Sequence, residues 1–142
     1  MPVRVVINEA ELGRLLTAPG SPLVTAVRTA GKRVESQAKV NAPVNNGRLR
    51  ASIRSTTVAV PGRITARIGT DLPYAIYQEK GTGVYAGRGP IRPRRSQFLR
   101  FKPKGSKGFV YARQVRGTPP VRFLERALRT ASPWPVVSSG NR

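Results

Sequence analysis

The stretch "SPLVTAVRTAGKRVESQAKVNAP", residues 21–43, is the clearest element of the sequence, and it predicts a long helix. Ser21 can cap this helix, and Pro22 suits its first position. Apolar residues then recur every three or four positions on one face: Leu23, Val27, Ala30, Val34 and Ala38. Pro43 and Gly47 prevent its continuation, so the helix should be roughly 30 Å long.

After this helix the apolar period changes to two, which is typical of strands. Apolar residues alternate with polar or basic ones in two runs, namely Leu49, Ala51 and Ile53, and then Ile64, Ala66 and Ile68. The "VPG" turn at residues 60–62 separates the runs, so together they predict a β-hairpin. The apolar phase slips between Ile53 and Val58, and we expect a β-bulge there.

Helices are also predicted towards both ends of the chain. Asn8 followed by Glu11 resembles a capping box, preceded by an alternating stretch from Val3 to Ile7. The buried stripe of this first helix would be Leu12, Leu15 and Leu16. In "TPPVRFLERALRTA", Thr118 can cap the last helix. Its first residue would be Pro119, and its stripe would consist of Phe123 or Leu124 with Ala127, Leu128 and Ala131.

Residues 81–116 are expected to form extended arms, after one or two helical turns at 74–80. The segment 81–97 is rich in Gly, Pro and Arg, which indicates a long mobile loop. "FLRFKPK" and "FVYARQV" flank "GSKG" and predict a second, basic hairpin. The predicted fold is α+β: a single domain over residues 1–131, with a long helix packed on an antiparallel sheet and a closing C-terminal helix. Residues 132–142 would be a flexible tail.

The composition argues against catalysis. The chain has no cysteine and no histidine, which excludes disulfides, zinc fingers and Ser-His-Asp or Cys-His chemistry. Its six acids are scattered, so a two-carboxylate or metal-dependent site is not expected. We therefore assign no catalytic, cofactor-binding or metal-binding residue, and expect no small-molecule substrate. The sequence also lacks a long apolar run and a secretory signal pattern, so no membrane partner is expected.

The formal net charge of +20 is the strongest compositional signal. So large a charge repels itself unless a partner compensates it, and nucleic acid or an acidic protein surface would do so. Arginine use driven by a GC-rich genome would instead give solvated positive faces without a single target. Charge alone leaves these alternatives open.

Three motifs follow one another along the chain: "APVNNGRLRASI" at 42–53, "YAIYQEKGTG" at 74–83 and "GTPPVRFLERAL" at 117–128. This succession, over residues 21–131, resembles the tail-component family of long-tailed bacteriophages, whose members lie at the head–tail neck as tail-completion or tail-terminator proteins. The matching positions are Gly47, Leu49, Ser52 and Ile53; Tyr74, Ala75, Glu79, Gly81 and Thr82; and Pro120, Phe123, Leu124 and Ala127. The chain departs from the family pattern at Lys80, where an aromatic residue is common, and its 88–95 and 102–108 segments look expanded.

The resemblance implies a structural virion protein that does no chemistry. It implies a homo-oligomeric ring, a hexamer matching tail-tube symmetry, that completes the tail tube and joins it to the head connector around a lumen for DNA. The implied partners are other copies, the tail-tube protein, a head-side connector or stopper ring and the passing DNA. Assembly would occur in the host cytoplasm, and the protein would end in the neck of the virion. Glu79, which has no acid–base partner in sequence, is expected to hold local structure or to contact a neighbouring subunit.

The basic region 88–113 supports a different hypothesis, a nucleic-acid-binding protein. Cations that could contact nucleic acid or an acidic partner are Arg88, Arg92, Arg94, Arg95, Arg100, Lys102, Lys104 and Lys107. Four aromatic residues interleave with them, as stacking platforms would: Phe98, Phe101, Phe109 and Tyr111. The competing interpretation, which the alternation favours, is that these aromatic side chains fill the apolar face of the sheet.

Overall fold

The computed structural model describes residues 8–45 and 47–136, and the chain divides into two compact units. Unit 1 comprises residues 1–72 and 123–142, and unit 2 comprises residues 73–122. Helices and two antiparallel sheets are both present, which confirms the predicted α+β class. Residues 3–7, expected to alternate, and residues 137–142 of the expected tail lie outside the described residues.

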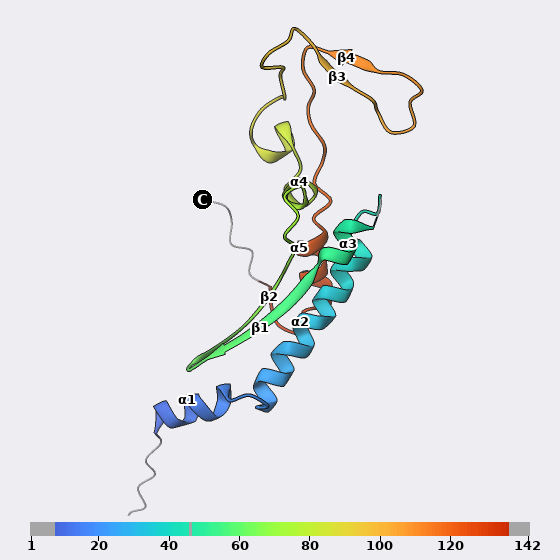
Figure 1. Ribbon diagram of the computed structural model, residues 1–142. Coiled ribbons are helices and arrows are strands. Elements are labelled where there is room, and N and C mark those ends of the chain that lie inside the picture. The colour runs from blue at the N-terminus through green and yellow to red at the C-terminus, as the bar shows by residue number, and fades with distance from the viewer. Residues whose placement is uncertain (1–7, 46, 137–142) are drawn as a thin grey trace, which may run out of the picture. The chain divides into compact units, whose positions relative to one another are not determined.

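Unit 1 is built around the long helix α2 (Pro22–Asn41). Its N-terminus is capped as predicted: the Leu23 N–H donates to Ser21 Oγ at 3.3 Å, and Pro22 occupies the first turn. The helix runs along the antiparallel hairpin formed by β1 (Arg54–Val60) and β2 (Arg63–Gly69), as Figure 1 shows. The C-terminal helix α5 (Phe123–Ala131) also packs on α2 and closes the unit.

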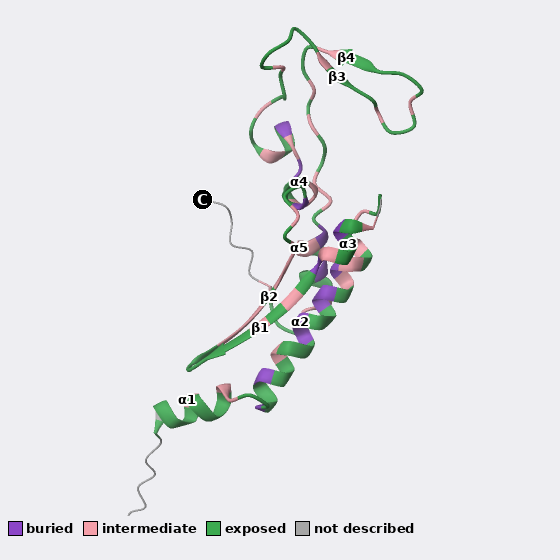
Figure 2. Ribbon diagram, in the orientation of Figure 1, coloured by how far each residue is buried: buried purple, intermediate pink, exposed green. Residues whose placement is uncertain are grey.

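The core of unit 1 is small, and Phe123 and Ile53 are its largest fully buried side chains. Buried residues, purple in Figure 2, recur along α2 and include Ala30, Val34 and Ala38 of the predicted stripe. The buried face is rotated from the prediction at its start, where Val24 is buried and Leu23 is exposed. Gly31 lies on the buried face, where an added Cβ would come within 3.2 Å of the Ala66 Cβ. The absence of a side chain at Gly31 therefore allows β2 to approach α2 closely.

Residues 48–52 form the short helix α3 (Arg48–Ser52), so the prediction that a strand begins at Leu49 is wrong. Gly47 precedes the helix with a left-handed backbone (φ 77°), and its carbonyl accepts from the Ala51 N–H at 3.0 Å. Leu49 and Ile53 are both buried, whereas Ala51 is exposed. In a strand, Leu49, Ala51 and Ile53 would share one face, whereas a helical turn places only Leu49 and Ile53 together. The exposure of Ala51 therefore fits the helical turn.

The β1–β2 pairing is continuous from Arg54↔Gly69 to Val60↔Arg63, so the predicted bulge is also wrong. The apparent phase slip has a different cause. Ile53 is the C-terminal cap of α3 and not part of the strand, so its burial does not follow the alternation of β1. The turn at residues 60–62 and the hairpin itself are confirmed.

The N-terminal helix α1 (Glu9–Thr17) is capped as expected, because the Glu11 N–H donates to Asn8 Oδ1 at 3.2 Å. Its leucines do not form a buried stripe. Leu12, Leu15 and Leu16 are all exposed, because α1 has few contacts with the rest of unit 1.

Helix α5 begins at Phe123 and not at Pro119. The predicted cap residue Thr118 is instead hydrogen-bonded to another part of unit 2, so it is not available to start a helix. Phe123 and Ala127 are fully buried, as the predicted stripe requires, but Leu128 is exposed. Leu124 and Ala131 are half-buried.

Unit 2 contains short elements joined by long irregular segments. These are helix α4 (Ala75–Lys80), the 3₁₀ helix η1 (Gly83–Ala86) and the strands β3 (Leu99–Phe101) and β4 (Val110–Ala112). The antiparallel β3–β4 pairing confirms the second hairpin. The segment 81–97 is largely irregular, as predicted, but two backbone hydrogen bonds of 2.8 and 3.0 Å join Ile91 to Val115.

Candidate interaction surfaces

Two of the three motifs meet in unit 2, where Thr82 of the second motif and Thr118 of the third are hydrogen-bonded although they lie 36 positions apart in the sequence. The Thr82 N–H donates to the Thr118 carbonyl at 3.0 Å, and the Thr118 N–H donates back to Thr82 Oγ1 at 2.8 Å. Nearby, the Val121 N–H donates to the Gln78 carbonyl at 2.7 Å. These bonds tie the outgoing chain after α4 to the chain that returns from the β3–β4 hairpin.

Gly81 makes this close pairing possible. Its N–H donates to the Tyr77 carbonyl at 2.9 Å and ends α4, and its backbone has φ 76° and ψ −173°. That conformation is essentially restricted to glycine. A Cβ at this position would also lie 2.7 Å from the Thr118 carbonyl oxygen, so any other residue would force the paired segments apart. Backbone geometry thus explains the glycine that stands two residues after Glu79.

The other residues of the second motif lie on or beside α4. Ala75 is buried, Glu79 is half-buried in the last turn, and Tyr74 is the exposed N-terminal cap residue. Among residues 8–45 and 47–136, no group of three or more acids comes together as a metal site would require. A structural or subunit-contact role for Glu79 stays a prediction.

The first and third motifs contribute mainly to the core of unit 1. Leu49, Ile53, Phe123 and Ala127 are buried there. Ser52 Oγ donates to the Leu49 carbonyl at 2.7 Å and is also hydrogen-bonded to Thr70 Oγ1, which joins α3 to the end of the hairpin. Leu124 is half-buried in unit 1, and Pro120 is half-buried in unit 2.

The eight cations singled out in the sequence are all exposed in unit 2. The guanidinium of Arg100 lies 3.9 Å from the centre of the Phe109 ring, a cation–π contact between the two strands' segments. The four aromatic residues Phe98, Phe101, Phe109 and Tyr111 are all exposed, and 62% of Tyr111 is accessible to solvent. The interpretation that these aromatic side chains fill a covered sheet face is therefore wrong within this chain. A two-stranded sheet has no second layer of its own to bury them.

A buried ion cluster in unit 1 was not found from the sequence. Glu35 is buried on α2, where its carboxylate pairs with Lys39 at 2.7 Å and Lys32 at 3.0 Å. It also accepts from the Ser55 N–H at 2.9 Å and Ser55 Oγ at 2.7 Å, so it fastens α2 to β1. The bonds from Lys39, and next those from Ser55, lower the pKa of Glu35 to about 2, against the opposing effect of burial. Lys32 and Lys39 lie three and four positions from Glu35, and these helical spacings could have indicated the ion pairs. No local pattern indicates the contact with Ser55.

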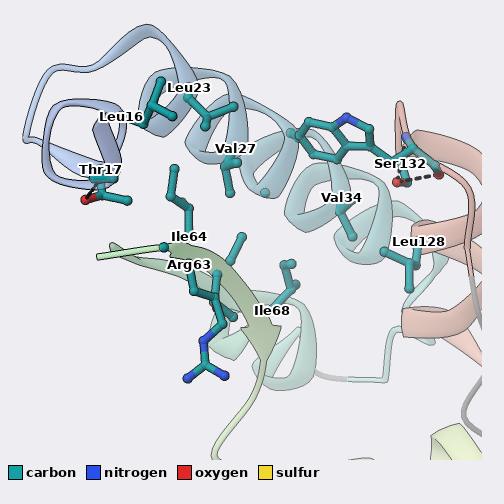
Figure 3. Close-up of a pocket in the computed structure, with 17 residues that line it drawn as sticks. Leu16, Thr17, Leu23, Val27, Val34, Arg63, Ile64, Ile68, Leu128 and Ser132 are labelled. Carbon is teal, nitrogen blue, oxygen red and sulfur yellow. Dashed lines mark hydrogen bonds between the residues drawn. The ribbon is translucent and has the colours of Figure 1, made fainter. Parts of the chain in front are cut away.

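Unit 1 also has an apolar groove of about 600 Å³, which we call the unit 1 groove. It lies between α1, α2, β2 and α5, and Figure 3 shows Val27 and Val34 of α2 on one side and Ile64 and Ile68 of β2 on the other. The sequence did not indicate it, because Leu16 and Leu23 were placed in the core and Trp134 in a loose tail. All three side chains are partly exposed and line the groove.

Comparison with known protein families matches residues 23–81 to the family described as "Bacteriophage HK97-gp10, putative tail-component". The match runs from α2 to the end of α4 and includes the first motif and most of the second. It confirms the resemblance to tail components of long-tailed phages, and it supports a structural role in the virion. No match was found among curated proteins or solved structures. In the described part of the chain, no helix is long and apolar enough to cross a membrane.

Proposed function

We propose that the protein is a ring-forming subunit of the phage neck, where it completes the tail tube and joins it to the head-side connector. Identical copies close by head-to-tail contacts, six to the ring, around a lumen through which DNA passes. The tail-tube protein and a head-side ring are its axial partners, and the copies assemble in the host cytoplasm. The protein does no chemistry. The observation that carries the proposal is the match of residues 23–81 to a phage tail-component family.

The distribution of apolar side chains supports a subunit that neighbours complete. The helix α1 exposes Leu15 with 66% of its surface accessible, and the β3–β4 hairpin exposes aromatic side chains on an unpartnered sheet. A small core with exposed apolar faces on both units is what a protein stabilised by assembly requires. The strand edges of both hairpins can also extend a neighbour's sheet.

The test is the mass of the nuclease-treated protein in solution, measured by light scattering at 100 and 500 mM salt, with negative-stain images of the same samples. We expect a ring of about six copies at 500 mM salt, where repulsion between the copies is screened. A protein that stays monomeric at both salt concentrations, and also on addition of purified tail tubes, would contradict the ring.

The exposed hairpin specifically favours one other function, binding of single-stranded nucleic acid. Tyr111 and Phe109 are free to stack on bases, and Arg100 already lies over the Phe109 ring. Binding through six or more phosphates should weaken by about 10³ or more between 50 and 200 mM salt. The change Tyr111→Ala should then weaken binding by about 1–3 kcal/mol, whereas Tyr85→Ala, outside the hairpin, should not. Weak binding that neither salt nor Tyr111→Ala changes would exclude this function.

A further inference from the structure

We propose that the unit 1 groove binds an acidic amphipathic helix of a partner protein. The proposal does not require the ring, since it concerns a surface that lies wholly within unit 1 of one copy. It adds to the proposed function the chemical class of one protein partner, an acidic amphipathic helix.

The shape of the groove fits a short helix. Along α2 it extends from Leu23 to Val34, which is about 16 Å of helix axis. Figure 3 places Leu16 and Thr17 at one end, and Leu128 and Ser132 at the other. Three turns of a docked helix cover this length, with anchor side chains at positions i, i+4, i+7 and i+11.

The lining of the groove gives such anchors apolar contacts. Small residues line it where α2 and β2 come close, among them Ala30, Gly31 and Ala66. Larger side chains that also line it stay accessible to solvent, with Leu16 and Leu23 both 44% exposed and Trp134 48% exposed. A contiguous accessible apolar surface of this kind marks an interaction site, and its burial would supply most of the binding energy.

Charge selects the partner. The elements that line the groove carry exposed cations, among them Arg14, Arg28, Arg63 and Arg67. Among the acids of these elements whose side chains the structure describes, Glu35 is already held by two lysines and Glu125 pairs with Arg129, while Glu11 on α1 is exposed. A helix with acidic residues beside its apolar stripe is attracted to this surface. A second copy of the chain, with its net charge of +20, is repelled by it.

The probe is a synthetic capped peptide of about 12 residues, with Leu at the four anchor positions and Glu at the others, and without aromatic residues. Trp134 is the only tryptophan of the chain and lines the groove, so its emission reports occupancy directly. We expect a saturable blue shift of Trp134 emission with the full-length protein at low salt. The same peptide with Lys in place of Glu should bind at least about tenfold more weakly.

The chain offers a matched pair of variants on α1. Leu16→Glu introduces a carboxylate in the groove and should weaken binding at least about tenfold, while Leu15→Glu, on the neighbouring residue outside the groove, should change it less than about twofold. Circular dichroism checks that both variants are folded, and Leu23→Glu replaces Leu16→Glu if the latter is not.

Three results would overturn the proposal. They are the absence of a saturable shift, equal binding of the Glu and Lys peptides, and equal effects of Leu15→Glu and Leu16→Glu. Light scattering of the same samples reports the ring separately: if Leu16→Glu alone dissociates an oligomer, a second copy fills the groove and the acidic partner is wrong. If the ring persists in Leu16→Glu while peptide binding is weakened, the groove is not a contact between copies, and the acidic partner is supported.

Discussion

The buried carboxylate of Glu35 should make the stability of unit 1 depend on pH in a defined way. The change Glu35→Gln keeps the size of the side chain but removes its charge, and so removes both ion pairs with α2 lysines and weakens the link to Ser55 on β1. Because α2 and β1 form one side of the core, loss of this link should lower the free energy of unfolding.

The magnitude follows from the pKa of Glu35, which is lowered from 4.5 to about 2. At about 1.4 kcal/mol per pKa unit, this lowering sets an upper limit of roughly 3–4 kcal/mol. The side chains of Lys32 and Lys39 are 61% and 36% exposed, so water screens part of the interaction. We therefore expect Glu35→Gln to lower the free energy of unfolding at pH 7 by about 1–2 kcal/mol.

The sign of the pH effect is fixed, because the folded protein has the lower pKa. The contribution of Glu35 is fully present above the unfolded-state pKa of 4.5 and is lost as the pH falls towards 2. Urea unfolding of both proteins, followed by Trp134 emission between pH 7 and pH 2, measures the difference. The control is Glu125→Gln, which breaks an exposed pair with Arg129 and should cost less than about 0.5 kcal/mol. A difference between wild type and Glu35→Gln that does not shrink below pH 4.5 would refute the reasoning.

Two further changes test the close approach of Gly81 to Thr118 and the burial of Leu49 on the short helix α3. In thermal unfolding, Gly81→Ala should destabilise the protein by about 1–3 kcal/mol or more, because both the backbone conformation of Gly81 and the nearby Thr118 carbonyl exclude a Cβ. The control Gly108→Ala, where a Cβ meets open space, should have little effect in the same assay. Leu49→Ala should cost about 2–5 kcal/mol in urea unfolding because Leu49 is buried, and Leu15→Ala should cost less than about 0.5 kcal/mol. Equal effects of the two leucine changes would contradict the burial of Leu49.

The sequence predicted an element correctly where its capping residues and its apolar period indicate the same secondary structure. In α2, the cap at Ser21, the proline at the first position and the apolar period all point to one helix, and the observed bounds follow them. At residues 49–53, the same spacing fits a strand or one helical turn, because an alternating run of five residues also places positions i and i+4 together. Only packing against the rest of unit 1 decided for the helix.

Long-range contacts account for what the sequence could not show. Thr118 has the sequence of a helix cap, but its N–H is bonded to Thr82, and the helix begins five residues later. Glu35 bonds to Ser55, 20 residues away, on a strand whose position beside α2 the local pattern does not specify. The unit 1 groove depends on four separate elements, so it becomes visible only when they are placed together.

Two properties of the surface act in opposite directions during assembly. The apolar groove and the exposed aromatic hairpin favour association, while the charge of +20 opposes contact between free copies. At low salt the repulsion acts over a Debye length of roughly 10 Å or more, whereas a hydrophobic contact acts only when surfaces touch. An acidic partner removes the repulsion where it binds and adds apolar contact at the same place. At low salt we therefore expect the proposed ring to form on a neighbouring acidic surface in preference to free solution, which would restrict its assembly to the site in the virion where it is needed.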